Sequence, residues 1–437
     1  MIKRSLGGAL RTAALAGTVL LSGCVGDGDE LLTRGDPPAN GGELFTTYVA
    51  LGNSITAGFQ SGGLNDSLQI RAYPVLLAQR AGTDFEAPLI MRPGCPRPFL
   101  APLGVGGRIG STDTCVRLSN PRVIHNLAVP GERLRDLYQF PSVPNLASLN
   151  TLLIGPRTQV RAMIEARPTF VSVWIGNNDA LEAAVSGILG PRTAGGDPTL
   201  TPLLTFQTQL DVLLDSINYA NPQGAMLVGV VNPMFAAPLL QPGAYFFLAR
   251  DPATNRFNGK LVNANCSPIT ALGQPNPLAA NLVSFQVVGD TNVPEINCDP
   301  AVFGGVYLLD ASERIILNQR IAAFNEAIRL GAQQNGWLYV DPNAILSPYL
   351  QEQDAAGRFQ RIRKCQLLPS ATTVAQFETA VRNSCPVTGP TAAPNFFGSL
   401  LSFDGIHPSS EAHRILAGAF AAAINDKYDT TLSTATS

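Results

Sequence analysis

Ser54 follows an apolar stretch and precedes a helix-prone one in the segment VALGNSITAG, residues 49–58. A serine at such a turn can be a nucleophile presented at the end of a strand, but similar turns also bind phosphate groups. A phosphate-binding turn needs a G-x-G-x-x-G pattern or a P-loop lysine, and residues 49–58 have neither. The segment therefore favours a serine nucleophile.

A serine hydroxyl needs a neighbouring base to react at neutral pH, and imidazole suits this task. His407 is the candidate base, because Asp404 precedes it by three residues and could hold the ring in one tautomer. Gly405 would allow the chain to turn between them. The other two histidines have no aspartate at this spacing. We expect His125 to lie in a strand, as a core or rim residue, and His413 to face solvent on the last helix.

When a serine attacks a carbonyl group, negative charge develops on the carbonyl oxygen, and its stabilisation requires hydrogen-bond donors that are already in place. Gly131 in the segment PGERL and Asn178 in the segment GNND each follow a predicted strand. The backbone N–H groups of Ser54 and Gly131 and the side-chain amide of Asn178 could supply three donors. The alternatives are that Gly131 is an ordinary turn glycine and that Ser54 and Asn178 cap helices.

Five segments are rich in β-branched and aromatic residues and are predicted to be strands. They are residues 45–51, 122–129, 169–175, 225–231 and 337–341. Helical patterns separate them, and one of these places an apolar stripe on residues 205–220. Strands alternating with helices predict an α/β fold with a mostly parallel sheet covered on both faces. Functional residues of such sheets gather where the strands end, and Ser54, Gly131 and Asn178 each follow a predicted strand, whereas Asp404 and His407 precede the last predicted helix.

Four segments in this order, GNSITAG, PGERL, GNND and DGIH, resemble the sequence blocks of the SGNH, or GDSL-type, lipase and esterase superfamily. The resemblance implies a flavodoxin-like three-layer α/β/α sandwich with a central five-stranded sheet and loop insertions. It also implies a catalytic Ser54 with His407 and Asp404, and an oxyanion hole formed by Ser54, Gly131 and Asn178.

The resemblance further implies a serine esterase or lipase that hydrolyses carboxylic esters through an acyl-enzyme on Ser54, without a cofactor or metal. Acyltransferases and polysaccharide O-deacetylases share this architecture, and insertions that exclude water could favour acyl transfer. A non-catalytic lipoprotein that binds glycans or lipids is a third interpretation. It is suggested by Asn53, since the family usually has G-D-S where this chain has G-N-S. Asparagine keeps the hydrogen-bonding shape of aspartate but removes its negative charge.

The first residues, MIKRSLGGALRTAALAGTVLLSGC, combine basic residues with a short apolar stretch, which is typical of a secretory signal. The ending LSGC resembles the lipobox of bacterial lipoproteins, so we expect cleavage after residues 1–23 and lipidation of Cys24. An ordinary signal peptide is the alternative. A flexible tether over residues 24–41 would then join the lipid to the domain. Val25 favours anchoring in the outer membrane of the cell envelope over the inner one.

Six further cysteines are consistent with export, because disulfides form in oxidising compartments. Many pairings are possible, and we expect nearest neighbours to pair, since each pair encloses a stretch rich in Pro, Gly and Asn. The expected pairs are Cys95–Cys115, Cys266–Cys298 and Cys365–Cys385. Metal binding by these cysteines is the alternative. The sequence has no C-x-x-C motif, however, and it contains only three histidines, which makes a zinc site unfavourable.

The hydrolase domain is predicted to span residues 42–427, followed by a disordered tail over residues 428–437. Insertions are expected near residues 92–120, 236–305 and 360–395. A formal net charge of −2 provides no basic surface for nucleic acid. The expected partners are a small-molecule, lipid or glycan ester and, through the lipid anchor, a membrane. We expect a monomer.

Overall fold

The computed structural model describes residues 40–191, 196–353, 355, 359–365, 373, 375–377, 379, 385 and 396–435. The predicted signal peptide, Cys24 and nearly all of the tether lie outside the described residues. None of the helices in the described ranges is long and apolar enough to cross a membrane.

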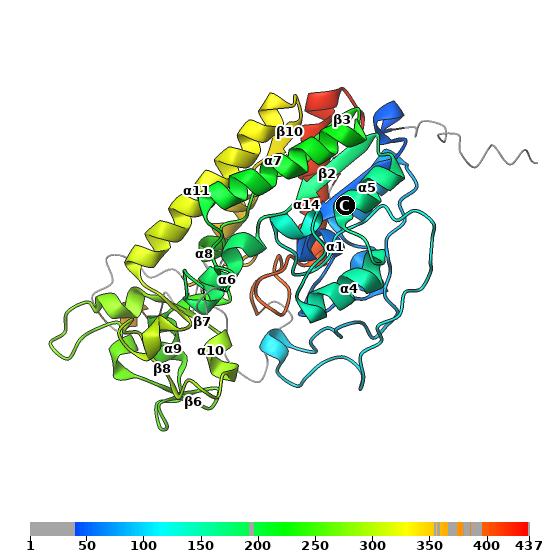
Figure 1. Ribbon diagram of the computed structural model, residues 1–437. Helices are drawn as coiled ribbons and strands as arrows, with labels where there is room; N and C mark the ends of the chain where they lie inside the picture. Colours follow the sequence, from blue (N-terminus) through cyan, green and yellow to red (C-terminus); the bar gives the residue numbers. More distant parts are fainter. Residues whose placement is uncertain are drawn as a thin grey trace, which may run out of the picture. The chain divides into compact units, whose positions relative to one another are not determined.

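The centre of the fold is a parallel sheet in the order β1-β2-β3-β10 (Figure 1). These strands are β1 (Tyr48–Gly52), β2 (Phe170–Trp174), β3 (Gly224–Val228) and β10 (Leu338–Val340). The predicted α/β class is thus confirmed, and four of the five predicted strands are present.

The predicted strand over residues 122–129 is the exception. It meets β1 through a single parallel bridge, between Asn126 and Ala50. The N–H groups of His125 and Asn126 bond instead to the carbonyl of Glu86. Backbone bonds from Leu127 to Ala50 (2.9 Å) and from Val129 to Gly52 (3.2 Å) still hold the segment along β1.

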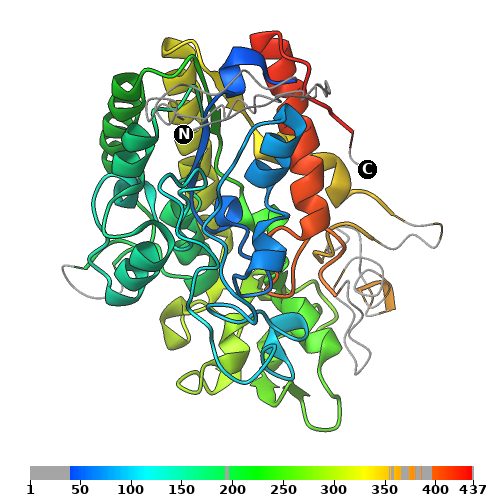
Figure 2. The same ribbon diagram turned by 90° about the vertical axis from the view of Figure 1, so that its right-hand side faces the viewer.

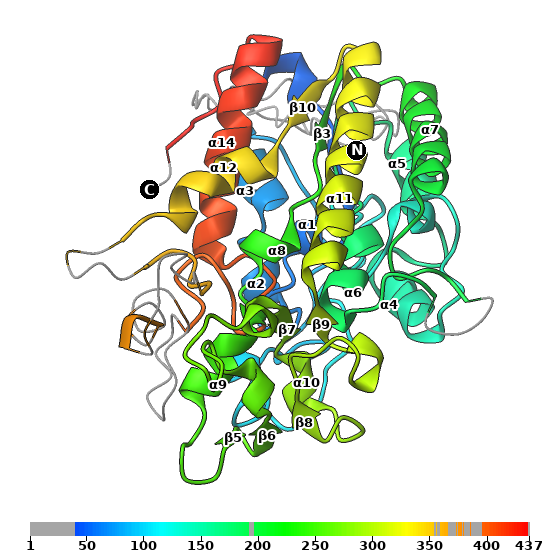
Figure 3. The same cartoon turned by 90° about the vertical axis from the view of Figure 1, so that its left-hand side faces the viewer.

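Helices cover both faces of the sheet. The main ones are α3 (Tyr73–Ala81), α4 (Pro144–Ile154), α5 (Gln159–Ala166), α6 (Asn178–Ser186), α7 (Leu203–Ala220), α11 (Ala311–Gln334) and α14 (Ser410–Tyr428). Shorter helices are α1 (Ser54–Ala57), α2 (Asp66–Gln69), α8 (Pro233–Ala236) and α12 (Pro342–Leu346). Helices α3 and α14 pack together on one face (Figure 2), and α5, α7 and α11 lie on the other (Figure 3). The arrangement is the predicted three-layer sandwich.

Successive side chains of a buried strand point to opposite faces of the sheet, so each strand contributes to the core on both faces. In β2, Trp174 contacts Tyr73 of α3 and Phe420 of α14, at ring-centroid distances of 5.5 and 5.7 Å. Val173 points to the opposite face and belongs to the cluster that contains Phe206.

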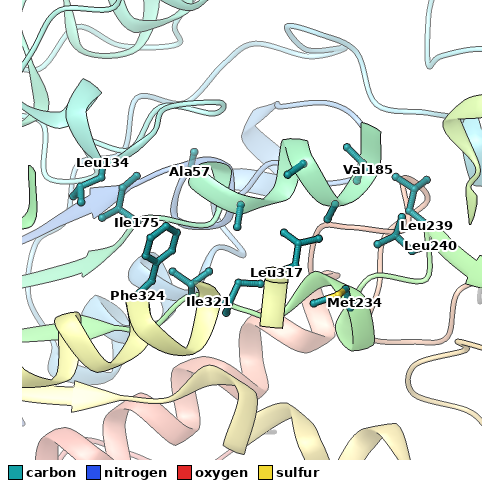
Figure 4. Packing of buried hydrophobic residues seen from close by; sticks show 14 of the residues in the cluster. Ala57, Leu134, Ile175, Val185, Met234, Leu239, Leu240, Leu317, Ile321 and Phe324 are labelled. Atoms are coloured by element: carbon teal, nitrogen blue, oxygen red, sulfur yellow. The ribbon is translucent and has the colours of Figure 1, made fainter. Parts of the chain in front are cut away.

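On that opposite face, the predicted apolar stripe of residues 205–220 is buried in α7. Its Phe206 stacks on Phe324 of α11, with the ring centroids 3.9 Å apart. Figure 4 shows Phe324 beside Ile175, with Ile321 and Leu317 of α11 further along the same cluster.

The insertion near residues 236–305 forms two small sheets, in the orders β4-β7-β9 and β5-β6-β8. Its elements are β4 (Leu240–Pro242), α9 (Gly243–Ala249), β5 (Arg256–Phe257), β6 (Lys260–Val262), β7 (Leu282–Ser284), α10 (Gln286–Gly289) and β8 (Glu295–Ile296). Strand β9 (Leu308–Leu309), directly after the insertion, completes the first of these sheets. Phe246, Phe257 and Phe285 form an aromatic core within it. A disulfide between Cys266 and Cys298 crosslinks this insertion.

The other two disulfides are Cys95–Cys115 and Cys365–Cys385, so the structure contains the three nearest-neighbour pairs. The prediction that residues 428–437 form a disordered tail is wrong for the first part of this segment. Leu432 is 3 % exposed, and its N–H donates to the side chain of Asn425 at 2.8 Å. An apolar residue just beyond α14 thus has a place in the core, which composition alone does not reveal.

Candidate active site

Ser54 lies where β1 ends, as the first residue of α1, and is 8 % exposed. Asn53 caps this helix, because its Oδ1 accepts a hydrogen bond from the N–H of Ile55 at 3.2 Å. An aspartate would cap the helix through the same oxygen. Among the described residues, the buried Asn53 Nδ2 has no hydrogen-bond partner. The departure from G-D-S therefore leaves the turn intact and places an unpaired amide beside the serine.

The C-terminal segment that carries His407, orange in Figure 1, returns to α1 at the carboxyl end of the sheet. His407 Nε2 lies 2.8 Å from Ser54 Oγ, and His407 Nδ1 lies 2.9 Å from Asp404 Oδ2. Gly405 has a φ of +71°, which permits the tight turn between the two residues. The three residues proposed from sequence thus form one hydrogen-bonded chain.

The carboxylate of Asp404 is surrounded by donors. Besides His407, the backbone N–H of Gly62 donates to Oδ2 at 2.7 Å, and the N–H groups of Ile406 and His407 each donate to Oδ1 at 2.9 Å. Burial opposes its charge, but the His407 ring and the hydrogen bonds from the backbone N–H groups of His407 and Ile406 lower the pKa of Asp404 to about 2. Asp404 is therefore ionised throughout the neutral range and can hold the His407 ring with Nδ1 protonated.

The other two histidines are engaged elsewhere. The half-buried His125 accepts a hydrogen bond at Nδ1 from the N–H of Glu86 at 2.9 Å, as expected of a rim residue. His413 is fully buried, so its predicted solvent exposure is wrong. It lies three and seven residues before Leu416 and Phe420 and thus on the apolar face of α14. Burial lowers the pKa of His413 to about 3 and keeps the ring neutral.

Sheet register brings the three proposed oxyanion donors to one edge. Gly52 is paired with Trp174 and accepts a hydrogen bond from Val129, so the chain beyond each of these residues emerges side by side. Ser54 lies two residues beyond Gly52. Gly131 lies two residues beyond Val129, on an exposed turn with a φ of +91°.

Asn178 is the first residue of α6, four residues beyond Trp174. Its side chain does not cap the helix but donates to the carbonyl of Glu132 at 2.8 Å, which ties α6 to the Gly131 turn. The side-chain amide has a second N–H, and Asn178 lines the same pocket as Ser54 and His407. Gly131 lies on the adjoining turn and is not among the residues that line the pocket.

Two residues that support this site, Phe59 and Glu132, were not predicted from the sequence. The ring of Phe59 packs against the His407 ring, with centroids 4.9 Å apart. The fully buried Glu132 accepts a hydrogen bond from Gln159, whose side chain also bonds to both backbone groups of Gly52. The signals were weak: Phe59 lies five residues after Ser54, and Glu132 is an acid directly after a turn glycine.

Burial raises the pKa of Glu132 to about 9, against the hydrogen bond from Gln159, and nearby Asp136 adds to the rise. The folded protein therefore keeps a proton that the unfolded chain releases above about pH 5. Replacing Glu132 with glutamine removes this titration and keeps an acceptor for Gln159. Relative to Glu132→Gln, the unfolding free energy of the wild type should fall by about 1.4 kcal/mol per pH unit between pH 5 and 9.

Urea unfolding of both proteins at several pH values would measure this difference. Stabilities that change in parallel with pH would mean that Glu132 is ionised in the folded protein.

The sequence model of the GDSL-like lipase/acylhydrolase family matches residues 48–420. No curated protein sequence matches the chain. Similar solved structures include a catalytic mutant of an acetylxylan esterase from Geobacillus stearothermophilus, with 12% identity, 90% of this chain and 96% of that chain covered, and a TM-score of 0.35. They also include an extracellular lipase from Streptomyces rimosus, with 15% identity, 84% and 94% covered, and a TM-score of 0.32. A third is phospholipase A1 from Streptomyces albidoflavus, with 13% identity, 87% of this chain and 98% of that chain covered, and a TM-score of 0.32. Because the family match extends over most of its length, the chain belongs to the GDSL-like lipase/acylhydrolase family.

Proposed function

We propose that the protein is a serine esterase or lipase that hydrolyses carboxylic esters through an acyl-enzyme on Ser54, with His407 as general base and Asp404 as its orienting carboxylate. One observation carries the proposal. The hydrogen bonds from Ser54 to His407 and from His407 to Asp404, at 2.8 and 2.9 Å, end beside a pocket that Ser54 itself lines.

In the first half of the reaction, Ser54 Oγ attacks the ester carbonyl carbon while its proton passes to His407 Nε2. Asp404 stabilises the imidazolium through Nδ1–H. The tetrahedral intermediate collapses when His407 gives this proton to the leaving alcohol oxygen. In the second half, water attacks the acyl carbon, His407 takes a proton from the water, and the carboxylic acid leaves as the Ser54 hydroxyl re-forms.

The negative charge on the former carbonyl oxygen is proposed to be stabilised by the Ser54 and Gly131 N–H groups and the free N–H of Asn178. The bond from Asn178 to Glu132 supports this role, because it fixes the amide before substrate arrives. Loss of one such donor in comparable sites lowers kcat by about 10²–10³-fold.

We further propose that the protein is exported and anchored by lipid on Cys24 at the cell envelope, in the outer membrane of a Gram-negative cell. The signal-like segment ending in LSGC supports this location. The three disulfides also support it, because such bonds persist in oxidising compartments.

A fluorophosphonate probe tests the assignment of the nucleophile, because the activated serine displaces fluoride and retains the phosphonyl group. We expect one adduct per folded protein, mapped to Ser54 by peptide mass spectrometry and absent in Ser54→Ala. Ser148→Ala, which removes an exposed serine on α4, should label like the wild type. A folded protein that neither labels nor hydrolyses any ester would refute catalysis and favour a binding lipoprotein. Labelling without hydrolysis would favour an acyltransferase.

A further inference from the structure

The pocket beside Ser54 has two kinds of wall. Ser54, Asn178 and His407 line one part of it, together with the neighbouring amide of Asn177. Most of the rest is aliphatic, and none of the described residues that line the pocket is Asp, Glu, Lys or Arg. The aliphatic walls come from several elements and include Leu181, Leu346, Ile362, Leu400, Leu401 and Ile406.

We propose that this pocket binds the acyl chain of the ester and selects hydrocarbon chains of about four to six carbons, an inference that rests on Ser54 being the nucleophile. The size follows from the cavity volume of about 60 Å³. One water-sized group needs about 10–15 Å³ of such volume, so the pocket has space for about four to six groups.

The aliphatic walls indicate that the pocket binds a hydrocarbon group and not a sugar. Sugar hydroxyl groups placed against these aliphatic side chains would lose their hydrogen bonds to water and gain none in return. A methylene chain loses no hydrogen bonds there and removes apolar surface from water. An acetyl group would leave most of the pocket unfilled, so the walls also discriminate against acetate esters.

The order of the reaction steps indicates that the pocket holds the acyl chain of the ester and not its alcohol. The alcohol must leave after the first step, whereas the acyl group stays bonded to Ser54 until water attacks. Leu400 and Ile362, which line the pocket, are 1 % and 2 % exposed, so this part of its wall is closed to solvent. An acyl chain held against these buried side chains can remain in place while the alcohol departs.

Hydrolysis of p-nitrophenyl esters from acetate to dodecanoate tests the chain-length preference in the wild-type protein. We expect kcat/KM to rise about fourfold for each methylene group from acetate to butanoate or hexanoate, because each is buried. It should fall for octanoate and longer chains. A maximum at acetate or dodecanoate would overturn the proposal.

Filling the pocket tests its location. Ala412, in the first turn of α14, and Leu181 of α6 line the pocket. Ala412→Val and Leu181→Phe should each lower kcat/KM for hexanoate at least tenfold more than for acetate. Leu204→Phe, at a position 76 % exposed on α7, is the matched control and should leave the ratio unchanged. An unchanged ratio in both pocket variants would place the acyl chain elsewhere.

Two further measurements separate the possible failures. Butanoate esters of methanol to octanol vary the alcohol alone, and a strong dependence on its length with none on the acyl chain would assign the pocket to the alcohol. A small fluorophosphonate should label Ser54 in all the variants, which also reports that they are folded. Labelling without any acyl preference would refute the pocket assignment alone, whereas absence of both labelling and hydrolysis would refute the proposed function.

Discussion

Replacing Ser54 or His407 with alanine is expected to lower kcat for p-nitrophenyl butanoate by about 10⁶-fold, the loss seen when such a unit is broken in other serine hydrolases. Ser54 Oγ lies 2.8 Å from His407 Nε2, so neither group can form the acyl-enzyme without the other. The double variant should therefore be no slower than the single ones. A residual rate of about 10³–10⁴ over water should persist, because the oxyanion donors and the pocket remain.

Steady-state kinetics of the purified variants, with circular dichroism to verify folding, measure this effect. His125→Ala is the control for the loss of an imidazole, since that ring contacts Glu86 instead of the catalytic chain. If the double variant were slower by the product of the two single losses, Ser54 and His407 would act independently. The hydrogen bond between them would then have no catalytic meaning.

The hydrogen-bonded chain of Ser54, His407 and Asp404 could be predicted from sequence because the chemistry proposed for it demands particular residue types at short spacings. Asp404 and His407 lie three residues apart, and Gly405 adopts the positive φ that their turn requires. Ser54 could be placed because a buried apolar strand ends directly before it. Local sequence thus determined both halves of the chain, and the parallel sheet brings them together.

Features that depend on contacts distant in sequence could not be predicted. The segment 122–129 has the composition of a strand, but Glu86 accepts hydrogen bonds from the N–H groups of His125 and Asn126, and the segment forms a single bridge to β1. His413 looks like a surface residue by type, although its position on α14 follows the apolar spacing. Glu132 looks like a solvated charge, and its partner Gln159 lies on α5, far along the chain.

The effect of Asp404→Asn is the sharpest test of how His407 is oriented. Both oxygens of Asp404 accept hydrogen bonds, Oδ2 from Gly62 and the His407 ring, and Oδ1 from Ile406 and His407 N–H. An asparagine must turn its NH₂ group toward one of these pairs of donors. If the NH₂ faces the ring, His407 changes tautomer and presents Nε2–H to Ser54, so it cannot take the serine proton.

We therefore expect Asp404→Asn to lower kcat by about 10⁴-fold with little change in KM, since no substrate contact is removed. Fluorophosphonate labelling of Ser54 should slow in parallel, because it needs the same proton transfer. Asp215→Asn, at an exposed position on α7, controls for the loss of a carboxylate and should match the wild type. A kcat within tenfold of the wild type, in a folded Asp404→Asn protein, would show that His407 acts without the negative charge of Asp404. The 2.9 Å contact would then serve only to position the ring, and catalysis would rest on Ser54 and His407.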